Sequence, residues 1–346
     1  MGIDLIGHKT PWYIKLIHAK WFQLLVILLV VSLAVFLINE NFASRVNIRG
    51  LMRGAIVPGI LIVAVGPLLA GGGIDLATST QATFAAIVFV KFTREVDMPW
   101  GFGVAAALLV GVIFGLINVL LIVRFNFLAF IATIGMSTIY IGLSRMWTEM
   151  LEVMHTNHDI IALGNLSILN NWVPVLFIFM TVLVAAYVYM MANTRFGRSI
   201  YMAGGNEAAA RLAGLNPKKI RAILFINSGV IAALAGVVWS ALNRMAHPSS
   251  LNESMPHFMT LTAVIIGGVS FRGGSGNLAA GFIGLLLVRV FDNGLTILGS
   301  RSYVNMAAQG LILIVALIAD HINAVRQRRA LEAAAIAAVD EQVIKA

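Results

Sequence analysis

Asp75 is an acidic residue in a stretch of the sequence that is otherwise apolar or uncharged. It follows Gly71, Gly72 and Gly73 and stands at the start of an apolar segment rich in hydroxyl and amide side chains. A carboxylate at the start of a helix accepts hydrogen bonds from the first free amides and is favoured by the helix dipole. We therefore expect Asp75 to cap a helix that restarts after a glycine break. Direct contact with a transported ligand and a role in gating are the alternatives.

Other polar side chains also lie in apolar segments, where contact with lipid would leave their hydrogen bonds unmade. Hydroxyls and amides supply donors and acceptors without a fixed charge, which suits a neutral polyol of the size of a sugar. The candidates for lining such a pathway are Asp75, Thr78, Ser79, Gln81, Asn118 and Asn305. Asn118, Asn305, Asn227, Ser228 and Gln309 are either hydrogen-bonding links between helices or part of the lining. Arg289 and Asp292 are expected to form a local ion pair.

The sequence carries no recognisable motif for catalysis or for binding a nucleotide. It contains neither a G-x-x-x-x-G-K-[ST] loop nor an H-E-x-x-H helix. It has no cysteine, which excludes disulfides and thiolate metal sites. His155 and His158 form its one close histidine pair, and we expect them to be solvated loop residues rather than metal ligands. We therefore assign no catalytic residue, metal site or cofactor to this chain.

The composition is that of a membrane protein. The chain has 346 residues, of which 60% are hydrophobic and 11% are charged, whereas soluble domains carry about 25% charged residues. This composition excludes an ordinary soluble enzyme and a disordered chain. The net charge is +9, but the basic residues lie mostly between apolar runs, where they set membrane orientation. We expect lipid as a partner and no nucleic acid.

Apolar runs long enough to cross a bilayer, about 20 residues, recur along the chain. The candidate segments are residues 21–38, 55–70, 76–90, 102–123, 127–143, 172–192, 222–242, 258–271, 278–290 and 303–319. Segments 76–90, 258–271 and 278–290 are too short to cross simply, and each adjoins a glycine cluster. Non-helical backbone at this depth is tolerated only where it is buried in protein or lines a cavity. The predicted fold is an all-α polytopic membrane protein of about ten helices with short, glycine-interrupted spans.

The distribution of Lys and Arg favours one orientation in the membrane. An even number of spans places both termini on one side, and most basic residues are cytoplasmic if that side is the inside. The richest clusters, 195–221 and 326–329, are then inside, and the loop 148–171 is outside. We therefore expect a cytoplasmic N-terminal segment (1–20), a transmembrane domain (21–322) with a cytoplasmic loop (193–221), and a cytoplasmic C-terminal tail (323–346).

The loop 193–221 contains a short helix with a start and a stop signal. Asn206 is the expected N-cap, and Glu207 complements the positive end of the helix dipole. The alanine-rich residues 208–213 favour a helix, and Gly214 ends it. The alanines leave a slim face that fits a groove on another protein. A plain surface helix that joins two spans is the alternative.

Three motifs in matching order and spacing resemble the membrane permease subunit of bacterial ABC importers of the ribose, xylose, arabinose and galactoside type. Residues 71–76 resemble its Gly-Gly-Ile-Asp-Leu-Ser signature, and residues 204–214 resemble its cytoplasmic Gly-Gly-Asn…Ala-Ala-Arg…Gly loop. Residues 266–276 resemble its Gly-Gly-Thr-Ser-Leu-x-Gly-Gly-x-Gly run. The resemblance covers about residues 50–321. It departs after Leu76, where Ala-Thr-Ser-Thr replaces the usual Ser-Val-Gly-Ser.

This resemblance implies a subunit of a bacterial inner-membrane importer for a monosaccharide or related small polyol. It implies a second permease copy or paralogue, separate ATPase subunits that bind ATP, and a periplasmic substrate-binding protein. The residues that it assigns to ATPase coupling are Asn206, Glu207, Ala208, Ala209, Arg211 and Gly214. A branched-chain amino acid type of ABC permease and a secondary transporter are the alternatives. The lack of mid-span carboxylates argues against the secondary transporter.

Overall fold

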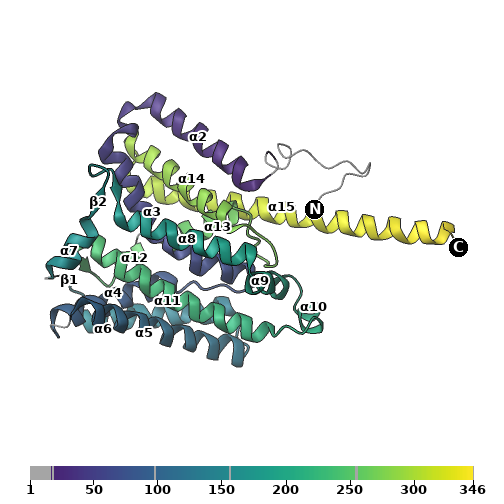
Figure 1. The fold of residues 1–346 in the computed structure, drawn as a ribbon, viewed down its shortest axis with the longest axis horizontal. Helices are drawn as coiled ribbons and strands as arrows, with labels where there is room; N and C mark the ends of the chain where they lie inside the picture. The colour runs from purple at the N-terminus through teal and green to yellow at the C-terminus, as the bar shows by residue number, and fades with distance from the viewer. Residues whose placement is uncertain (1–16, 18, 97–98, 156, 254–255, 346) are drawn as a thin grey trace.

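The computed structural model describes residues 17, 19–96, 99–155, 157–253 and 256–345 (Figure 1). In this part of the chain, the only sheets are two short ladders, β1–β4 and β2–β3. Eight helices are long and apolar enough to span a membrane: α2, α3, α5 with its π-helical continuation η2, α6, α8, α11, α14 and the first half of α15. An all-α polytopic fold is therefore confirmed. The count of ten spans is not, because α4 and α13 are shorter.

The elements follow one another with short connections. In chain order they are α2 (Lys20–Ile38), η1 (Glu40–Ala43), α3 (Arg45–Ala70), α4 (Thr78–Arg94), α5 (Trp100–Asn118), η2 (Val119–Arg124), α6 (Ala129–Thr148), β1 (Val153–Met154), α7 (His158–Asn165), β2 (Ser167–Ile168), β3 (Val173–Pro174), α8 (Val175–Asn193), α9 (Arg195–Gly205), α10 (Glu207–Leu212), α11 (Pro217–Asn243), β4 (Met245–Ala246), α12 (Ser250–Glu253), α13 (Pro256–Ile266), α14 (Leu278–Ile297) and α15 (Ser302–Lys345).

Helix α11 is central in the bundle and packs along α3, α4 and α5. Small residues bring the backbones into contact, as is common between membrane helices. A Cβ placed on Gly229 of α11 would lie 2.2 Å from the carbonyl oxygen of Gly111 in α5. A Cβ on Gly236 of α11 would lie 2.0 Å from the carbonyl oxygen of Ala82 in α4. These three helices therefore form one closely packed unit.

The structure corrects one of the three short spans. Segment 278–290 is the first part of α14, which runs to Ile297 and is long enough to cross a membrane. The apolar run ends early in the sequence because Arg289 and Asp292 interrupt it, but these residues pair with each other at 3.0 Å. The prediction of short helices is confirmed for the other two segments, since α4 has 17 residues and α13 has 11.

Two helices begin or end far from their predicted limits. Helix α3 starts at Arg45, well before the predicted residue 55, because Ser44 caps it through the amide of Asn47. Helix α15 does not stop at residue 319 but continues without a break to Lys345. The predicted tail 323–346 is thus a helical extension as far as residue 345, whereas most of the predicted segment 1–20 lies outside the described residues.

The bundle has two distinct ends, named here the α10 end and the α7 end after the helices found there (Figure 1). The extension of α15 projects past the α10 end. Helix α2 also begins there, since a Cβ on Gly268 would meet the side chain of Lys20. Helix α7 and the β-ladders lie at the α7 end. The loop 193–221 and both described chain ends therefore share one end of the bundle.

The expectation of solvated histidines is wrong for His155. His158 is exposed, but His155 is only 6% exposed and packs edge-on against the ring of Phe89. Neither ring nitrogen of His155 has a hydrogen-bond partner among the described residues. The backbone places it there, because its amide donates to the carbonyl oxygen of Arg244 next to the β1–β4 ladder. Burial lowers the pKa of His155 to about 4.

We expect the purified protein to lose stability between pH 7 and pH 5 because of His155. The unfolded chain binds a proton near pH 6.5 and the folded chain only near pH 4, so stability falls as the pH drops through this window. The loss at pH 5 is about 2 kcal/mol. His155→Phe should remove this part of the pH dependence of Tm in detergent, whereas His158→Phe should leave it intact. Equal pH profiles for wild type and His155→Phe would contradict the prediction.

Candidate functional site

Asp75 lies in a non-helical break between α3 and α4. Its carboxylate is 5% exposed, and Oδ1 accepts a hydrogen bond from the amide of Ala77 at 2.9 Å. The expected helix cap is not formed, because Ala77 holds the N-cap position of α4 without a side-chain cap, and Asp75 instead accepts from the amide of Ala77 in the turn just before the helix. The glycines before it allow the break, because Gly72 has φ +74°.

The second carboxylate oxygen of Asp75 joins three helices. Its Oδ2 accepts from Ser228 Oγ of α11 at 2.9 Å, from Asn118 Nδ2 of α5 at 3.3 Å and from Gln81 Nε2 of α4 at 3.5 Å. Asp75 thus does more than bond to the turn before α4. It is the centre of a buried polar cluster that also contains Asn118, Gln81 and Ser228. Asn118 and Gln81 were predicted to line the pathway, and Ser228 was predicted either to line it or to link helices.

Several oxygens around this cluster are buried without a hydrogen-bond partner among the described residues. They are Thr78 Oγ1, Gln81 Oε1, Asn118 Oδ1 and Tyr140 OH. Tyr140, which the sequence did not single out, is stacked on Phe114 at 3.9 Å between ring centroids. These uncharged groups can all accept hydrogen bonds, and the two hydroxyls can also donate them. Around the carboxylate of Asp75, the described residues therefore leave several uncharged hydrogen-bonding atoms unused.

Ser79 connects α4 to the second short helix. Its hydroxyl lies 2.7 Å from Nδ1 of His257, near the start of α13. His257 and Asp75 both line a small pocket between the end of α3, the break and α13. Sequence reasoning missed His257, because only the fold brings the starts of α4 and α13 together.

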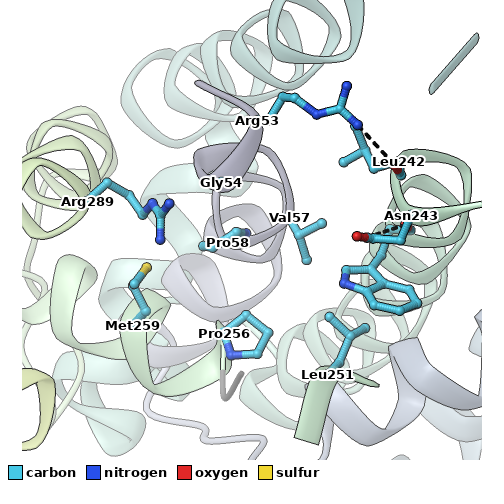
Figure 2. Close-up of a pocket in the computed structure, with 11 residues that line it drawn as sticks. Arg53, Gly54, Val57, Pro58, Leu242, Asn243, Leu251, Pro256, Met259 and Arg289 are labelled. Atoms are coloured by element: carbon cyan, nitrogen blue, oxygen red, sulfur yellow. Dashed lines mark hydrogen bonds between the residues drawn. The ribbon is translucent and has the colours of Figure 1, made fainter. Parts of the chain in front are cut away.

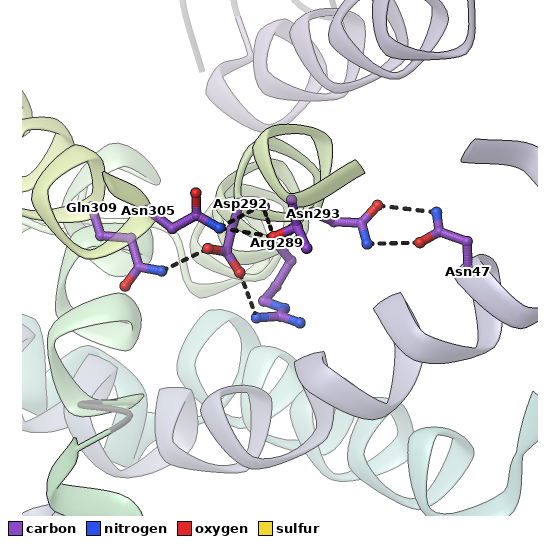
Figure 3. A network of polar contacts seen from close by, with 7 residues as sticks. Asn47, Arg289, Asp292, Asn293, Asn305 and Gln309 are labelled. Atoms are coloured by element: carbon purple, nitrogen blue, oxygen red, sulfur yellow. Dashed lines mark hydrogen bonds and ion pairs between the residues drawn. The ribbon is translucent and has the colours of Figure 1, made fainter. Parts of the chain in front are cut away.

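Asn305 belongs to a different cluster, centred on Asp292 of α14 (Figure 3). Its amide donates to Thr296 Oγ1 at 2.8 Å, and Gln309 donates to Asp292 Oδ1 at 2.9 Å. The other oxygen of Asp292 accepts from Arg289, which confirms the predicted ion pair. These contacts tie α14 to α15, so the geometry gives Asn305 the role of a link between helices.

A pocket of about 310 Å³ opens near the α7 end between α3, α11, α12, α13 and α14 (Figure 2). Arg53 and Arg289 lie on its border, and Trp239 and Asn243 also line it. Arg53 donates to the carbonyl oxygen of Leu242 at 2.9 Å. No pattern in the sequence indicated this pocket, because its lining comes from five separate helices.

The three glycine motifs meet at the α10 end in what we name the glycine junction, formed by Gly72, Gly204, Gly205, Gly273 and Gly274. The amide of Gly274 donates to the carbonyl oxygen of Ala70 at 2.8 Å. A Cβ on Gly204 would lie 2.0 Å from that same oxygen, and one on Gly274 would lie 2.4 Å from Cα of Gly205. The end of α3, the end of α9 and the turn after α13 are therefore in backbone contact.

The predicted helix of the loop 193–221 is present as α10. Asn206 caps it by accepting from the amide of Ala209 at 3.0 Å, and Gly214 follows with φ +79°. Glu207 pairs with Arg211 and Arg221. The hydrogen bond from Arg211 is the main reason that the pKa of Glu207 is lowered, so this carboxylate is ionised at neutral pH.

Helix α10 also exposes an apolar face. Leu212 is 90% exposed, and Ala208 and Ala209 are exposed beside it, whereas Ala210 is buried against the protein. Sequence reasoning did not select Leu212, although a leucine in a short, otherwise alanine-rich and polar loop helix is a usable signal. Leu212, Ala208 and Ala209 together make a small exposed apolar patch on the loop helix.

The buried polar cluster around Asp75 lies within a bundle of helices that are long and apolar enough to cross a membrane, so the chain has the fold of a multi-pass membrane protein. The chain belongs to the family described as branched-chain amino acid transport system / permease component, whose model matches residues 48–317.

Curated relatives cover most of the chain. It is 30% identical over 310 residues to a ribose import permease protein of Haemophilus influenzae, a match that covers 88% of this chain and 94% of that one. It is 28% identical to a fructose import permease protein of Rhizobium meliloti (88% and 86% covered) and 27% identical to an L-arabinose transport system permease protein of Escherichia coli (86% and 90% covered). No solved structure matches the chain.

Proposed function

We propose that this chain is the inner-membrane subunit of an ATP-driven importer for a monosaccharide or related small polyol. A separate ATPase hydrolyses ATP, and this chain provides the pathway together with a second copy or a paralogue. The names of the relatives, which are import permeases for ribose, fructose and arabinose, support the substrate class. The hydroxyl and amide groups around Asp75 have the hydrogen-bonding chemistry that a polyol would use. The observation that carries the proposal is the exposed apolar face of α10.

Helix α10 is built to contact a partner on the α10 end. It is short and held at both ends, by the Asn206 cap and by the turn at Gly214. Its outward face consists of Ala208, Ala209 and Leu212, which a groove with an apolar floor would cover. Because α9 and α11 adjoin it directly, a force on α10 reaches the bundle through two helices.

We expect Leu212→Asp to abolish co-purification of the ATPase with the permease. The substitution places a charge in an apolar contact and does not touch a span. Ala209→Trp should block docking by its bulk, and Glu207→Lys should weaken it by opposing the helix dipole and breaking the pairs with Arg211 and Arg221. Leu169→Asp is the matched control, because Leu169 is 70% exposed at the α7 end. Wild-type amounts of ATPase bound to Leu212→Asp would contradict the proposal.

The orientation that we propose places the α10 end and both termini in the cytoplasm. The chain has no cysteine, so single cysteines report accessibility without background. A membrane-impermeant maleimide added outside should label Asn157→Cys and leave Arg211→Cys unlabelled until the membrane is opened. The opposite pattern would invert the proposed topology.

A periplasmic binding protein is then expected to dock on the α7 end. Arg45, Arg49 and Arg53 follow one another at four-residue spacing along α3, with Arg244 close to Arg53. None of the ion pairs among the described residues involves them; Arg45, Arg49 and Arg53 donate to backbone carbonyl oxygens instead. This basic surface suits a partner that presents carboxylates.

An importer for branched-chain amino acids is the second candidate, because the description of the family includes that substrate. Such a ligand carries one ammonium and one carboxylate group and an apolar side chain. The cluster around Asp75 provides one carboxylate and no cationic side chain in hydrogen-bond contact.

Uptake assays in proteoliposomes that contain the whole importer distinguish the candidates. We expect labelled pentoses or hexoses to be taken up when ATP is supplied. ATP-driven uptake of leucine but not of sugars would favour the second candidate, and uptake without the ATPase would favour a secondary transporter.

A further inference from the structure

We infer that Ser228 is a positioning residue that makes the Asp75 break follow the movement of α10 during transport. The inference rests on the proposed function, in which an ATPase moves α10. The supporting observation is that α9 and α11, the two helices beside α10, both contact the segment 71–75.

Helix α9, which precedes α10, holds the start of the break through the glycine junction. Gly204 is the residue next to the last in α9, and a Cβ on it would lie 2.0 Å from the carbonyl oxygen of Ala70 and 2.9 Å from the carbonyl carbon of Gly71. No side chain separates the two backbones. A displacement of the end of α9 is therefore passed to the end of α3 by direct contact.

Helix α11, which follows α10, holds the same segment at two points. A Cβ on Gly71 would lie 2.6 Å from Cδ1 of Leu224, so Leu224 packs on the start of the break. One turn further along α11, Ser228 Oγ donates to Asp75 Oδ2 at 2.9 Å. Leu224 and Ser228 are four residues apart and share one face of the helix. The inner part of α11 thus contacts both ends of the segment 71–75.

The hydrogen bond from Ser228 is the polar contact between α11 and the segment 71–75. Both residues are buried, with 0% exposure for Ser228 and 5% for Asp75, and buried hydrogen bonds to a carboxylate are stronger than those between neutral groups. Ser228 lies eleven residues into α11, which is about 16 Å along a helix. The segment that it holds leads directly into α4 and its polar residues Ser79 and Gln81. A rigid movement of α11 would carry α4 with it through the contact of Gly236 with Ala82, and this bond adds the link that makes the break before α4 follow the same movement.

The test is the number of ATP molecules hydrolysed per sugar molecule taken up by the complete importer in proteoliposomes. In Ser228→Ala we expect that number to rise about tenfold, the order of effect that loss of one charge-assisted hydrogen bond produces. Ser228→Cys keeps the side-chain volume but has a weak donor, and it should show the same change. Ser240→Ala is the matched control, because Ser240 is equally buried in α11 and donates only to Val237 O of its own helix.

An unchanged ratio in Ser228→Ala and Ser228→Cys would overturn the inference and leave the proposed function standing. A proportional loss of uptake and hydrolysis in both variants would also overturn it, because Ser228 would then only support the fold. If the wild-type chain binds no ATPase, the proposed function itself fails, and the inference with it. Co-purification of the ATPase with each variant is therefore measured first.

Discussion

Gly204→Ala is expected to abolish transport, with uptake below a tenth of the wild-type rate. The added Cβ would lie 2.0 Å from the carbonyl oxygen of Ala70, at a point where backbone meets backbone and no side chain can move away. Overpacking typically costs about 1–3 kcal/mol, and a clash with backbone belongs at the upper end of that range. The cost falls on the glycine junction, which joins α3, α9 and the turn after α13. We therefore expect a lower Tm in detergent as well as the loss of uptake.

Gly142→Ala and Gly310→Ala are the controls for this prediction. Both glycines lie within helices, α6 and α15, and no atom outside their own helices lies within 4 Å of the position of an added Cβ. Alanine is also the better helix former. Both variants should keep wild-type uptake and Tm at matched membrane expression. A Gly204→Ala protein with wild-type uptake and Tm would show that the junction opens more easily than its contacts indicate.

Asp75→Asn is expected to transport at half the wild-type rate or better, whereas Asp75→Ala should lose at least nine-tenths of uptake. Asparagine keeps an oxygen for the amide of Ala77, and its NH₂ group can donate to a rotated Ser228 hydroxyl or to the amide oxygen of Asn118, which has no partner now. Alanine removes the acceptor from four donors at once. Each buried donor left unpaired costs about 1–3 kcal/mol.

Uptake of the sugar in both variants, at matched membrane expression, is the measurement. Thr80→Val is the control, because Thr80 is buried in the same helix start but donates only to the carbonyl oxygen of Ala77. Equal and complete loss of uptake in Asp75→Asn and Asp75→Ala would mean that the charge of Asp75 is required, and not its hydrogen bonds.

The features that sequence reasoning predicted best depend on neighbours along the chain. The cap at Asn206, the stop at Gly214 and the ion pair between Arg289 and Asp292 are all local. The end of α14 was missed because polar residues look like the end of a span when their partners are unknown. One of those partners is Asn47, whose amide exchanges two hydrogen bonds with Asn293 from 246 positions away (Figure 3).

The composition of the polar site could be predicted only in part, for the same reason. The pattern of glycines and hydroxyls indicated that Asp75 lies at a break, but it placed the hydrogen bond of Asp75 on the helix rather than on the turn before it. It could not indicate that Asn118 and Ser228 converge on its carboxylate or that Asn305 belongs with Asp292, because depth along a helix and rotation about its axis are set by packing. His257 and Tyr140 were missed because a single histidine or tyrosine carries no periodic signal.

The hydrogen bond between Asp75 and Ser228 spans 153 positions of the chain, and this separation affects how the protein is made. At a synthesis rate of about 5–20 residues per second, Asp75 is made roughly 8–30 seconds before Ser228 of α11. During this interval Asp75 lacks its donor from α11, and exposing the polar start of α4 to lipid costs free energy. The half-made chain must therefore shelter α4 against α3, α5 or the insertion machinery. Its final arrangement is settled only when the later half of the chain arrives, so a nascent chain that stalls before α11 remains open to chaperones and membrane proteases.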